Sequence, residues 1–343
     1  MSKLYIRYIC HKIITMSLYK MLGFTQKNNK SLRKTRKNTV KKTPMICSPA
    51  IKDKAVTSDT CFTANILTKI KSDYNHTNRA DPIRETDPKK ILRELRQRLS
   101  HCGKEDCWLR QIKDDTLRKK INDYVFAPKS PSEWNYNPNE WLSNLDIFNV
   151  LTQYEDKYPH FEFIGPSFID FEKKVGADQS SCVTDELCNF SLKQHMEKKH
   201  SKIAIVFNLD KHTGPGTHWV SLFVDIKDRF IFYFDSAGSK IPNEIMALVK
   251  RIQKQGLELS RKIRFKFYEN YPMTHQYSST ECGMYSLFFI ITMLLNKVDH
   301  HDEIDQPPVG RTKGGKFNRI HFFKKIRVPD SHVEKLRVKY FNK

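Results

Sequence analysis

The sequence predicts a mixed α+β fold, with a central mixed sheet and one helix buried in the core. Two aromatic and β-branched runs, at 219–224 and 230–234, are typical of paired strands. The run from Gly283 to Lys297 is apolar nearly all round, which is typical of a helix inside a core rather than on its surface. The apolar content of 39% is enough for a sizeable core.

The predicted elements of the first half begin after residue 85 and are mostly helices. Asp87-Pro88 has the residue types that start a helix. In chain order, helices are predicted over 89–99, 114–124, 139–154 and 190–200, residues 134–138 form a loop, and 163–171 form a loop or a short strand.

The second half supplies the sheet. Strands are predicted over 202–208, 219–224, 230–234 and 263–269, and an amphipathic helix over 243–256. If the turn between the middle two strands centres near Lys227, antiparallel pairing brings His218 within about two residues of Asp235, a diagonal neighbour at roughly 7 Å. Taken alone, this pair could also be a surface histidine and a turn aspartate.

A thiol, Cys282, lies at the start of the buried helix. The unpaired backbone N–H groups and the positive end of the helix dipole stabilise a thiolate there, and a neighbouring imidazolium would lower the thiol pKa further. Gly283 is small enough to let a substrate carbonyl approach the backbone, so the Cys282 N–H can help to hold an oxyanion. Gln276 can donate its side-chain amide to the same oxygen. The alternative is a buried structural cysteine.

The order His218, Asp235, Gln276, Cys282 is that of a cysteine protease of the SUMO-protease type. The segments FNLDKHTGPGTHWVSLFVD, FYFDSAG and THQYSSTECGMYSLFFI resemble the papain-related catalytic core of the Ulp1 and adenain class. Within that class they are most similar to the polyprotein-processing proteases of large nucleocytoplasmic DNA viruses, the group of the African swine fever virus SUMO-1-like protease and giant-virus thiol proteases. The likeness covers about 95–341 and is strongest over 203–295.

The resemblance implies a role for each of these residues: His218 is the general base, Asp235 its orienting partner, Cys282 the nucleophile and Gln276 the oxyanion donor. Trp219 resembles the tryptophan that walls a narrow substrate channel, and Trp141 resembles the one on a helix that faces the substrate tail. Either tryptophan could instead belong to the core.

The implied function is a cysteine endopeptidase that cuts viral structural precursors at Gly-Gly-X-like sites during virion maturation, in the virus factory of the host cytoplasm and in the virion. A channel narrowed by aromatic rings would select glycine, because any Cβ would clash. Two alternatives stay open: an isopeptidase acting on a ubiquitin-like modifier, and a non-catalytic basic DNA-binding core protein. No cofactor is implied.

Net charge is +22, and the first 50 residues hold 12 Lys or Arg and no acid. We therefore expect residues 1–85 to form a basic, largely disordered arm, and residues 86–343 to form the protease domain, with its catalytic core at about 200–298. Such an arm attaches to nucleic acid by counterion release, without reading sequence. The alternative is a solubilising or targeting tail.

The eight cysteines lack framework spacing, which suggests a reducing compartment. Two groups resemble metal ligands, His101 with Cys102 and Cys107, and Cys182 with Cys188. Neither pair of cysteines has the usual two-residue gap and no histidine pair completes a set, so a metal is not expected. No stretch of about 18 apolar residues is free of charge, so a membrane span is not expected either.

Overall fold

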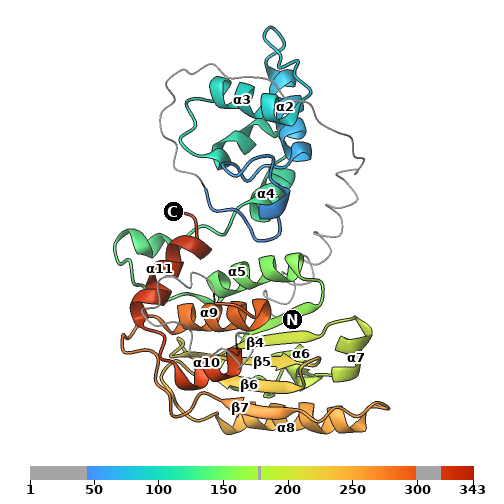
Figure 1. The fold of residues 1–343 in the computed structure, drawn as a ribbon, viewed down its shortest axis with the longest axis vertical. Helices are drawn as coiled ribbons and strands as arrows, with labels where there is room; N and C mark the ends of the chain where they lie inside the picture. The colour runs from blue at the N-terminus through green and yellow to red at the C-terminus, as the bar shows by residue number, and fades with distance from the viewer. Residues whose placement is uncertain (1–44, 177–178, 299–317) are drawn as a thin grey trace. The chain divides into compact units, whose positions relative to one another are not determined.

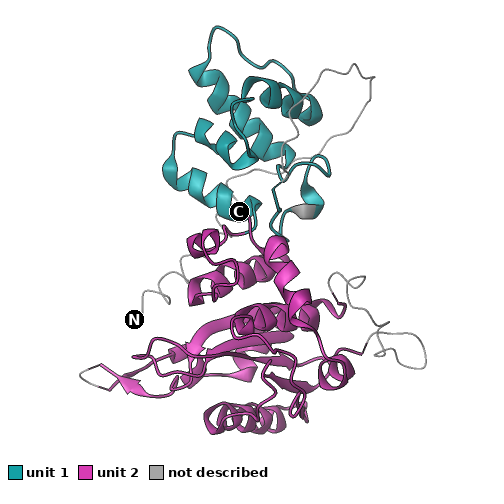
Figure 2. Cartoon of the chain, turned by 90° about the vertical axis from the view of Figure 1, so that its left-hand side faces the viewer, with its two compact units in different colours: residues 1–127 teal, residues 128–343 magenta. Residues whose placement is uncertain are grey.

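The computed structural model describes residues 45–176, 179–298 and 318–343 (Figure 1). The chain divides into two compact units, residues 1–127 and 128–343, which we call the helical unit and the sheet unit (Figure 2). The sequence predicts a boundary at residue 85, which lies between two helices of one compact unit. Residues 1–44 of the predicted arm lie outside the described residues.

The helical unit is built from short helices around an apolar core. They are η1 (Lys52–Lys54), α2 (Ala64–Thr77), α3 (Pro88–Arg98), η2 (Glu105–Gln111) and α4 (Asp115–Val125). Phe62 stacks on Trp108 with ring centroids 5.7 Å apart and meets Phe126 edge-on at 5.5 Å. Residues 45–85 are therefore folded rather than disordered, because α2 buries an apolar face in this core.

The sheet unit contains the remaining elements. They are η3 (Ser132–Asn135), α5 (Asn144–Lys157), β1 (Phe161–Phe168), β2 (Lys174–Val175), β3 (Ser181–Cys182), α6 (Asp185–Cys188), α7 (Leu192–Glu197), β4 (Lys202–Asn208), β5 (Trp219–Asp225), β6 (Phe230–Phe234), α8 (Asn243–Glu258), β7 (Lys266–Glu269), α9 (Cys282–Leu295), α10 (Arg319–Lys325) and α11 (Asp330–Tyr340).

Five strands form the central sheet in the order β1-β4-β5-β6-β7. The middle strands β4, β5 and β6 pair antiparallel, while β1 pairs with β4 and β7 with β6 in parallel. The sheet is thus mixed, as the sequence predicts. In the described part of the chain, no helix combines the length and apolarity that a membrane crossing requires.

Helices cover both faces of this sheet (Figure 1). On one face Val220, Leu222 and Val224 of β5 share a core with the apolar side of α8. On the other face Phe234 of β6 stacks on Phe289 of α9, with ring centroids 4.6 Å apart. Because both faces are covered, the strands read as continuous apolar runs. Every residue of α9 from Cys282 to Leu294 is buried, which confirms the prediction of a helix inside the core.

Candidate active site

His218 and Asp235 meet at one end of the β5–β6 hairpin. Ser221 pairs with Phe234, so the same register extended by one residue sets Asp235 opposite Val220, two residues from His218. This offset is the one that the sequence predicts. The side chains close the remaining distance, and Nε2 of His218 lies 2.7 Å from Oδ1 of Asp235.

Asp235 is held firmly by its surroundings. Its side chain is 1% exposed. Its backbone N–H donates to Oδ1 of Asn270 at 2.9 Å, and Nδ2 of Asn270 donates back to its carbonyl at 2.7 Å. The N–H of Ala237 donates to the carboxylate oxygen that His218 contacts, at 2.8 Å. Asn270 lies just after β7 and was not singled out in the sequence. An Asn after a predicted strand carries no signal that would have found it.

His218 is positively charged at neutral pH in this setting. Burial lowers its pKa, but hydrogen bonds to Asp235 and Cys282 and the negative charges of those two partners outweigh burial and raise the pKa to about 10. Its ordinary value is 6.5. The imidazole therefore bridges the carboxylate and the thiol, which brings three of the predicted site residues together.

Cys282 is the first residue of α9, and its side chain is buried. Glu281, the residue before it, makes no side-chain hydrogen bond to cap the helix. The first N–H groups of α9 are thus not taken up by a cap side chain, and they can stabilise negative charge at the thiol or at a nearby oxygen.

Packing also favours glycine at position 283, in addition to the approach of a substrate carbonyl that the sequence suggested. A Cβ on Gly283 would lie 3.0 Å from Cβ of Leu142, so the close approach of this loop needs a glycine. The carbonyl of Leu142 in turn accepts a hydrogen bond of 3.0 Å from Nε1 of Trp219. Leu142 therefore links the start of α9 to the strand that follows His218.

Gln276 lies in the loop before α9 and is tied to the residue after Asp235. Oγ of Ser236 donates to Oε1 of Gln276 at 2.7 Å, and the backbone N–H of Gln276 donates to the Ser236 carbonyl at 2.9 Å. Nε2 donates to the carbonyl of Ser278 at 2.8 Å, which uses one of its two hydrogens. The second hydrogen is available to another acceptor.

Two further residues hold the Gln276 loop, and neither was predicted. His275 is buried, and burial lowers its pKa to about 4, so it is neutral. Its Nδ1 accepts from the N–H of Val328, and its Nε2 donates to the carbonyl of Phe323, which fixes the ring. Asp330, the first residue of α11, accepts the backbone N–H of Tyr277 at 3.1 Å.

A buried ion pair anchors the N-terminal end of α9 to α11. Glu281 and Arg337 of α11 are both buried, and Nη2 of Arg337 lies 2.8 Å from Oε1 of Glu281. Burial raises the pKa of Glu281, while the neighbouring guanidinium works against that rise. The start of the helix that carries Cys282 is therefore anchored to a helix near the end of the chain.

A cleft of about 550 Å³ opens beside the hairpin. Its lining includes Trp141 and Leu142 together with Gly216 and Trp219, which flank Thr217 and His218 in the sequence. Trp219 is buried, whereas Trp141 is 39% exposed. The predicted helix over 139–154 begins later, at Asn144, because Ser143 and Asp146 form a capping box. Trp141 therefore lies in the loop before α5.

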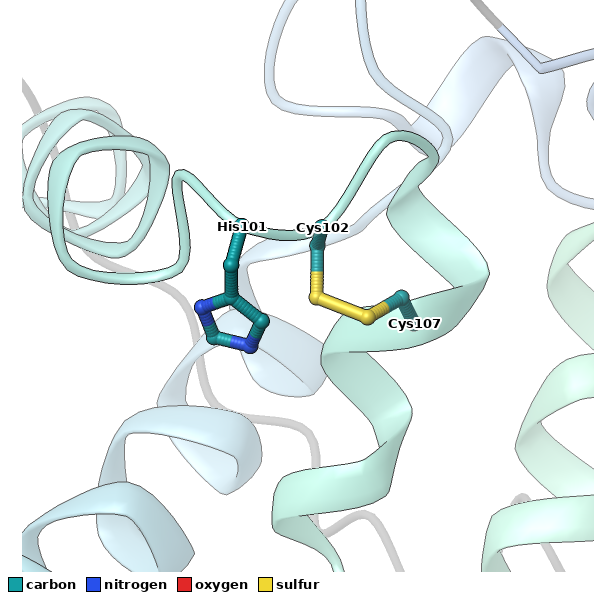
Figure 3. A group of neighbouring side chains, drawn as sticks. All are labelled: His101, Cys102 and Cys107. Carbon is teal, nitrogen blue, oxygen red and sulfur yellow. A yellow bond between two sulfur atoms is a disulfide. The ribbon is translucent and has the colours of Figure 1, made fainter.

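The cysteines that resemble metal ligands in the sequence form disulfides. Cys102 is bonded to Cys107 beside His101 (Figure 3), and Cys182 is bonded to Cys188. Cys47 and Cys61 form a third disulfide, and Cys282 is the free cysteine among the described residues. The expectation of reduced cysteines was wrong for these six, because sequence spacing does not report which Cβ atoms meet in space. Bonded sulfurs are not thiolate ligands.

Comparison with known proteins agrees with this geometry. Residues 144–340 match the family described as Ulp1 protease family, C-terminal catalytic domain. A thiol protease of Acanthamoeba polyphaga mimivirus is 30% identical over 267 residues, which are 73% of this chain and 84% of that protein. A cysteine protease of African swine fever virus is 30% identical over 254 residues, which are 68% of this chain and 90% of that protein.

The fold is also similar to a solved structure. The crystal structure of an African swine fever virus protease matches with a TM-score of 0.57 at 20% identity, covering 88% of this chain and 97% of that one. At that identity the match concerns the fold, which is a mixed sheet with helices on both faces in this chain.

Proposed function

The chain belongs to the Ulp1 protease family and is a cysteine protease, and we propose that it is an endopeptidase that cleaves viral structural precursors after Gly-Gly. The catalytic part of this proposal rests on two contacts of the charged His218, one with Asp235 and one with Cys282. The substrate part rests on the resemblance to viral polyprotein proteases and on the cleft between two tryptophans.

In the proposed acylation step, the Cys282 thiolate attacks the carbonyl carbon of the scissile bond. A C–S bond forms, and the carbonyl oxygen becomes an oxyanion that accepts hydrogen bonds from the Cys282 N–H and from Gln276 Nε2. When the intermediate collapses, the C–N bond breaks, and the His218 imidazolium gives its proton to the departing amine. The product is a thioester on Cys282.

Deacylation reverses these roles. Neutral His218 takes a proton from a water molecule, whose oxygen attacks the thioester carbon. The C–S bond then breaks, the acid product leaves, and the thiolate and imidazolium return. Asp235 stabilises the charged ring in both steps and holds its orientation, because it accepts the Nε2 hydrogen throughout.

The proposed preference for glycine is supported by one fixed aromatic wall of the cleft. Trp219 is fixed by the hydrogen bond of its Nε1 to Leu142, so that wall cannot swing away to admit a larger residue. Gly216 adopts φ +94°, and a Cβ there would lie 3.1 Å from Nδ2 of Asn208, so this position of the wall favours glycine. A substrate without Cβ atoms is best accommodated between such walls.

An isopeptidase acting on a ubiquitin-like modifier is the second candidate, because such a modifier presents the same Gly-Gly end. One African swine fever virus relative is named a SUMO-1 cysteine protease. Both reactions would use the same catalytic residues and differ in what occupies the cleft.

Two further parts of the proposal concern where the protease acts and what its basic segment binds. We propose that the acid-free basic segment before residue 45 binds DNA without sequence preference. This would keep the protease near its precursors in the virus factory and in the virion.

The test uses the purified full chain with a panel of Gly-Gly-X peptides and with SUMO and ubiquitin fusions. Cleavage after Gly-Gly in peptides with multiple values of X supports the endopeptidase, and the Cys282→Ala variant controls for contaminating proteases. Cleavage restricted to folded fusions would favour the isopeptidase. Replacing either glycine by alanine should abolish cleavage, and cleavage that persists would contradict the proposed selection.

A further inference from the structure

A second group of reactive side chains lies away from the cleft, on the face of the sheet that α8 covers. Glu162 of β1 is only 3% exposed. It pairs in register with Ile203, and it shares its face of β1 with Ile164, both members of the apolar core. A carboxylate in such a place must be compensated by a charged or metal partner, because burying a lone charge is costly.

Two histidines reach this carboxylate. His195 lies on α7, and His200 lies in the turn between α7 and β4. Nδ1 of His195 is 3.7 Å from Oε2 of Glu162, and Nδ1 of His200 contacts the same oxygen. The three ligand atoms lie within 4.8 Å of one another. Both rings are largely buried, each with 12% of its side chain exposed.

The Nδ1 atoms of both histidines face the carboxylate. Within the described residues, neither Nδ1 atom has a hydrogen-bond partner, although both converge on one carboxylate oxygen. The ring of Phe190 packs on His195 with centroids 4.8 Å apart, which shields the group on its apolar side. Convergence of nitrogen and oxygen atoms on one point is what a bound cation requires.

We propose that Glu162, His195 and His200 bind a divalent transition metal, with Zn²⁺ as the best match. Two imidazoles and a carboxylate are ligands that Zn²⁺ takes, with a water molecule in the fourth position. Ligand atoms at about 2.0–2.2 Å from a tetrahedral Zn²⁺ lie roughly 3.3 Å from one another. The 3.7 Å between Nδ1 of His195 and Oε2 of Glu162 needs an adjustment of only a few tenths of an ångström.

The metal would add a link between elements that strand pairing and apolar packing already bring together. α7 has 6 residues, a length at which a helix is not stable by itself. The bound ion would join α7 and the turn before β4 to β1, and so would fasten the edge of the sheet. This site is separate from the proposed catalytic residues, and the inference does not depend on them.

The sequence signal for this site is His195 and His200 five positions apart, a spacing that by itself does not indicate a metal site. The glutamate comes from β1, more than 30 positions upstream, so its contribution is visible only in the folded chain.

The test is metal binding by the full chain carrying Cys282→Ala, so that the active-site thiol cannot act as a ligand. Reductant is left out, because reduction of the Cys182–Cys188 disulfide would add two thiolates to the same region. After removal of metal with a chelator, we expect one Zn²⁺ or Co²⁺ per chain, a Co²⁺ absorption spectrum typical of nitrogen and oxygen ligands, and a higher Tm with metal than without it.

Single variants assign the ligands. His195→Ala, His200→Ala and Glu162→Gln should each weaken Zn²⁺ binding by at least about 100-fold, since even residues that only support a ligand cost 10 to 100-fold. The matched control is His321→Ala, an exposed histidine of α10, which should bind like the parent chain. His195→Gln serves as the milder substitution if an alanine variant does not fold.

Absence of stoichiometric metal in the folded parent chain at micromolar Zn²⁺ would overturn the proposal, and this measurement needs no variant. Equal binding by the His195 and His200 variants would also overturn it, since the metal would then lie elsewhere. In either case the three side chains would form a contact of two imidazoles with Glu162 that holds no metal.

Discussion

Asn270 holds Asp235 through its backbone, accepting from the Asp235 N–H and donating to the Asp235 carbonyl. Neither bond uses the Asp235 side chain. These two bonds therefore do not depend on the carboxylate, so Asp235→Asn changes the charge offered to His218 while the Asn270 contacts remain. This separation makes the contribution of the charge measurable.

Cys282→Ala and His218→Ala should each abolish turnover, because nucleophile and base act as one unit. Asp235→Asn should leave measurable activity, since the Asn270 clamp remains and an amide oxygen can still accept from the ring. Single-turnover cleavage of a Gly-Gly-X peptide measures all three. Full activity of the Cys282 variant would end the assignment of the nucleophile.

Gln276→Ala should lower kcat by about 100-fold or more with little change in KM, because one oxyanion donor typically supplies roughly 2.7 to 4 kcal/mol in the transition state. Gln276→Glu is the matched control for shape. It keeps the acceptor for Ser236 but cannot donate, so it should be as damaging as alanine. If kcat is unchanged in both, Gln276 is a loop residue only.

The pH profile should show activity that persists well into the alkaline range. His218 has its pKa raised to about 10, so the imidazolium that protonates the leaving amine is present below that pH and is lost as the pH rises through it. Asp235→Asn removes a raising influence, so the alkaline limb of kcat/KM should move to lower pH. An alkaline limb near the ordinary histidine value of 6.5 in the parent chain would contradict this assignment.

The two tryptophans of the cleft should behave differently. Trp219→Ala should destabilise the fold by roughly 3–5 kcal/mol, because the ring is buried and its N–H is bonded. Trp141→Ala should change stability by only about 0.5 kcal/mol, since the ring is partly exposed, but should raise KM for peptides. Tyr136→Ala, an exposed aromatic outside the cleft, is the control. Equal KM in the Trp141 and Tyr136 variants would show that Trp141 does not bind substrate.

Deleting residues 1–44 should leave peptide cleavage intact and weaken DNA binding. The cut is placed before residue 45 because Cys47 belongs to a disulfide of the folded helical unit. With about five to eight phosphates contacted, DNA affinity of the full chain should fall steeply between about 50 and 200 mM salt, and the truncated chain should show a shallower slope. Equal affinity and slope for both chains would leave the segment as a solubilising or targeting tail.

The sequence was sufficient for the sheet unit's central strands and for the buried helix, since both depend on local apolar patterns. It also placed His218 relative to Asp235, because hairpin register follows from the turn. It did not predict α2, α10 or α11, and it did not point to Asn270, His275, Asp330 or Arg337. Each of those four acts through a partner distant in sequence, so no local pattern reveals it. The unit boundary lies later in the chain than the predicted residue 85, because the amphipathic helix α2 packs into the helical unit.

The buried pair of Glu281 and Arg337 bears on when the enzyme can first act. Glu281 precedes the nucleophile and Arg337 lies 56 positions later, so during translation the thiol leaves the ribosome before the residue that anchors its helix. A nascent chain in that interval has Glu281 buried without its counter-ion, or has not yet folded α9. Folding of the catalytic helix with Glu281 buried and paired therefore requires the segment that carries Arg337 to have been synthesised.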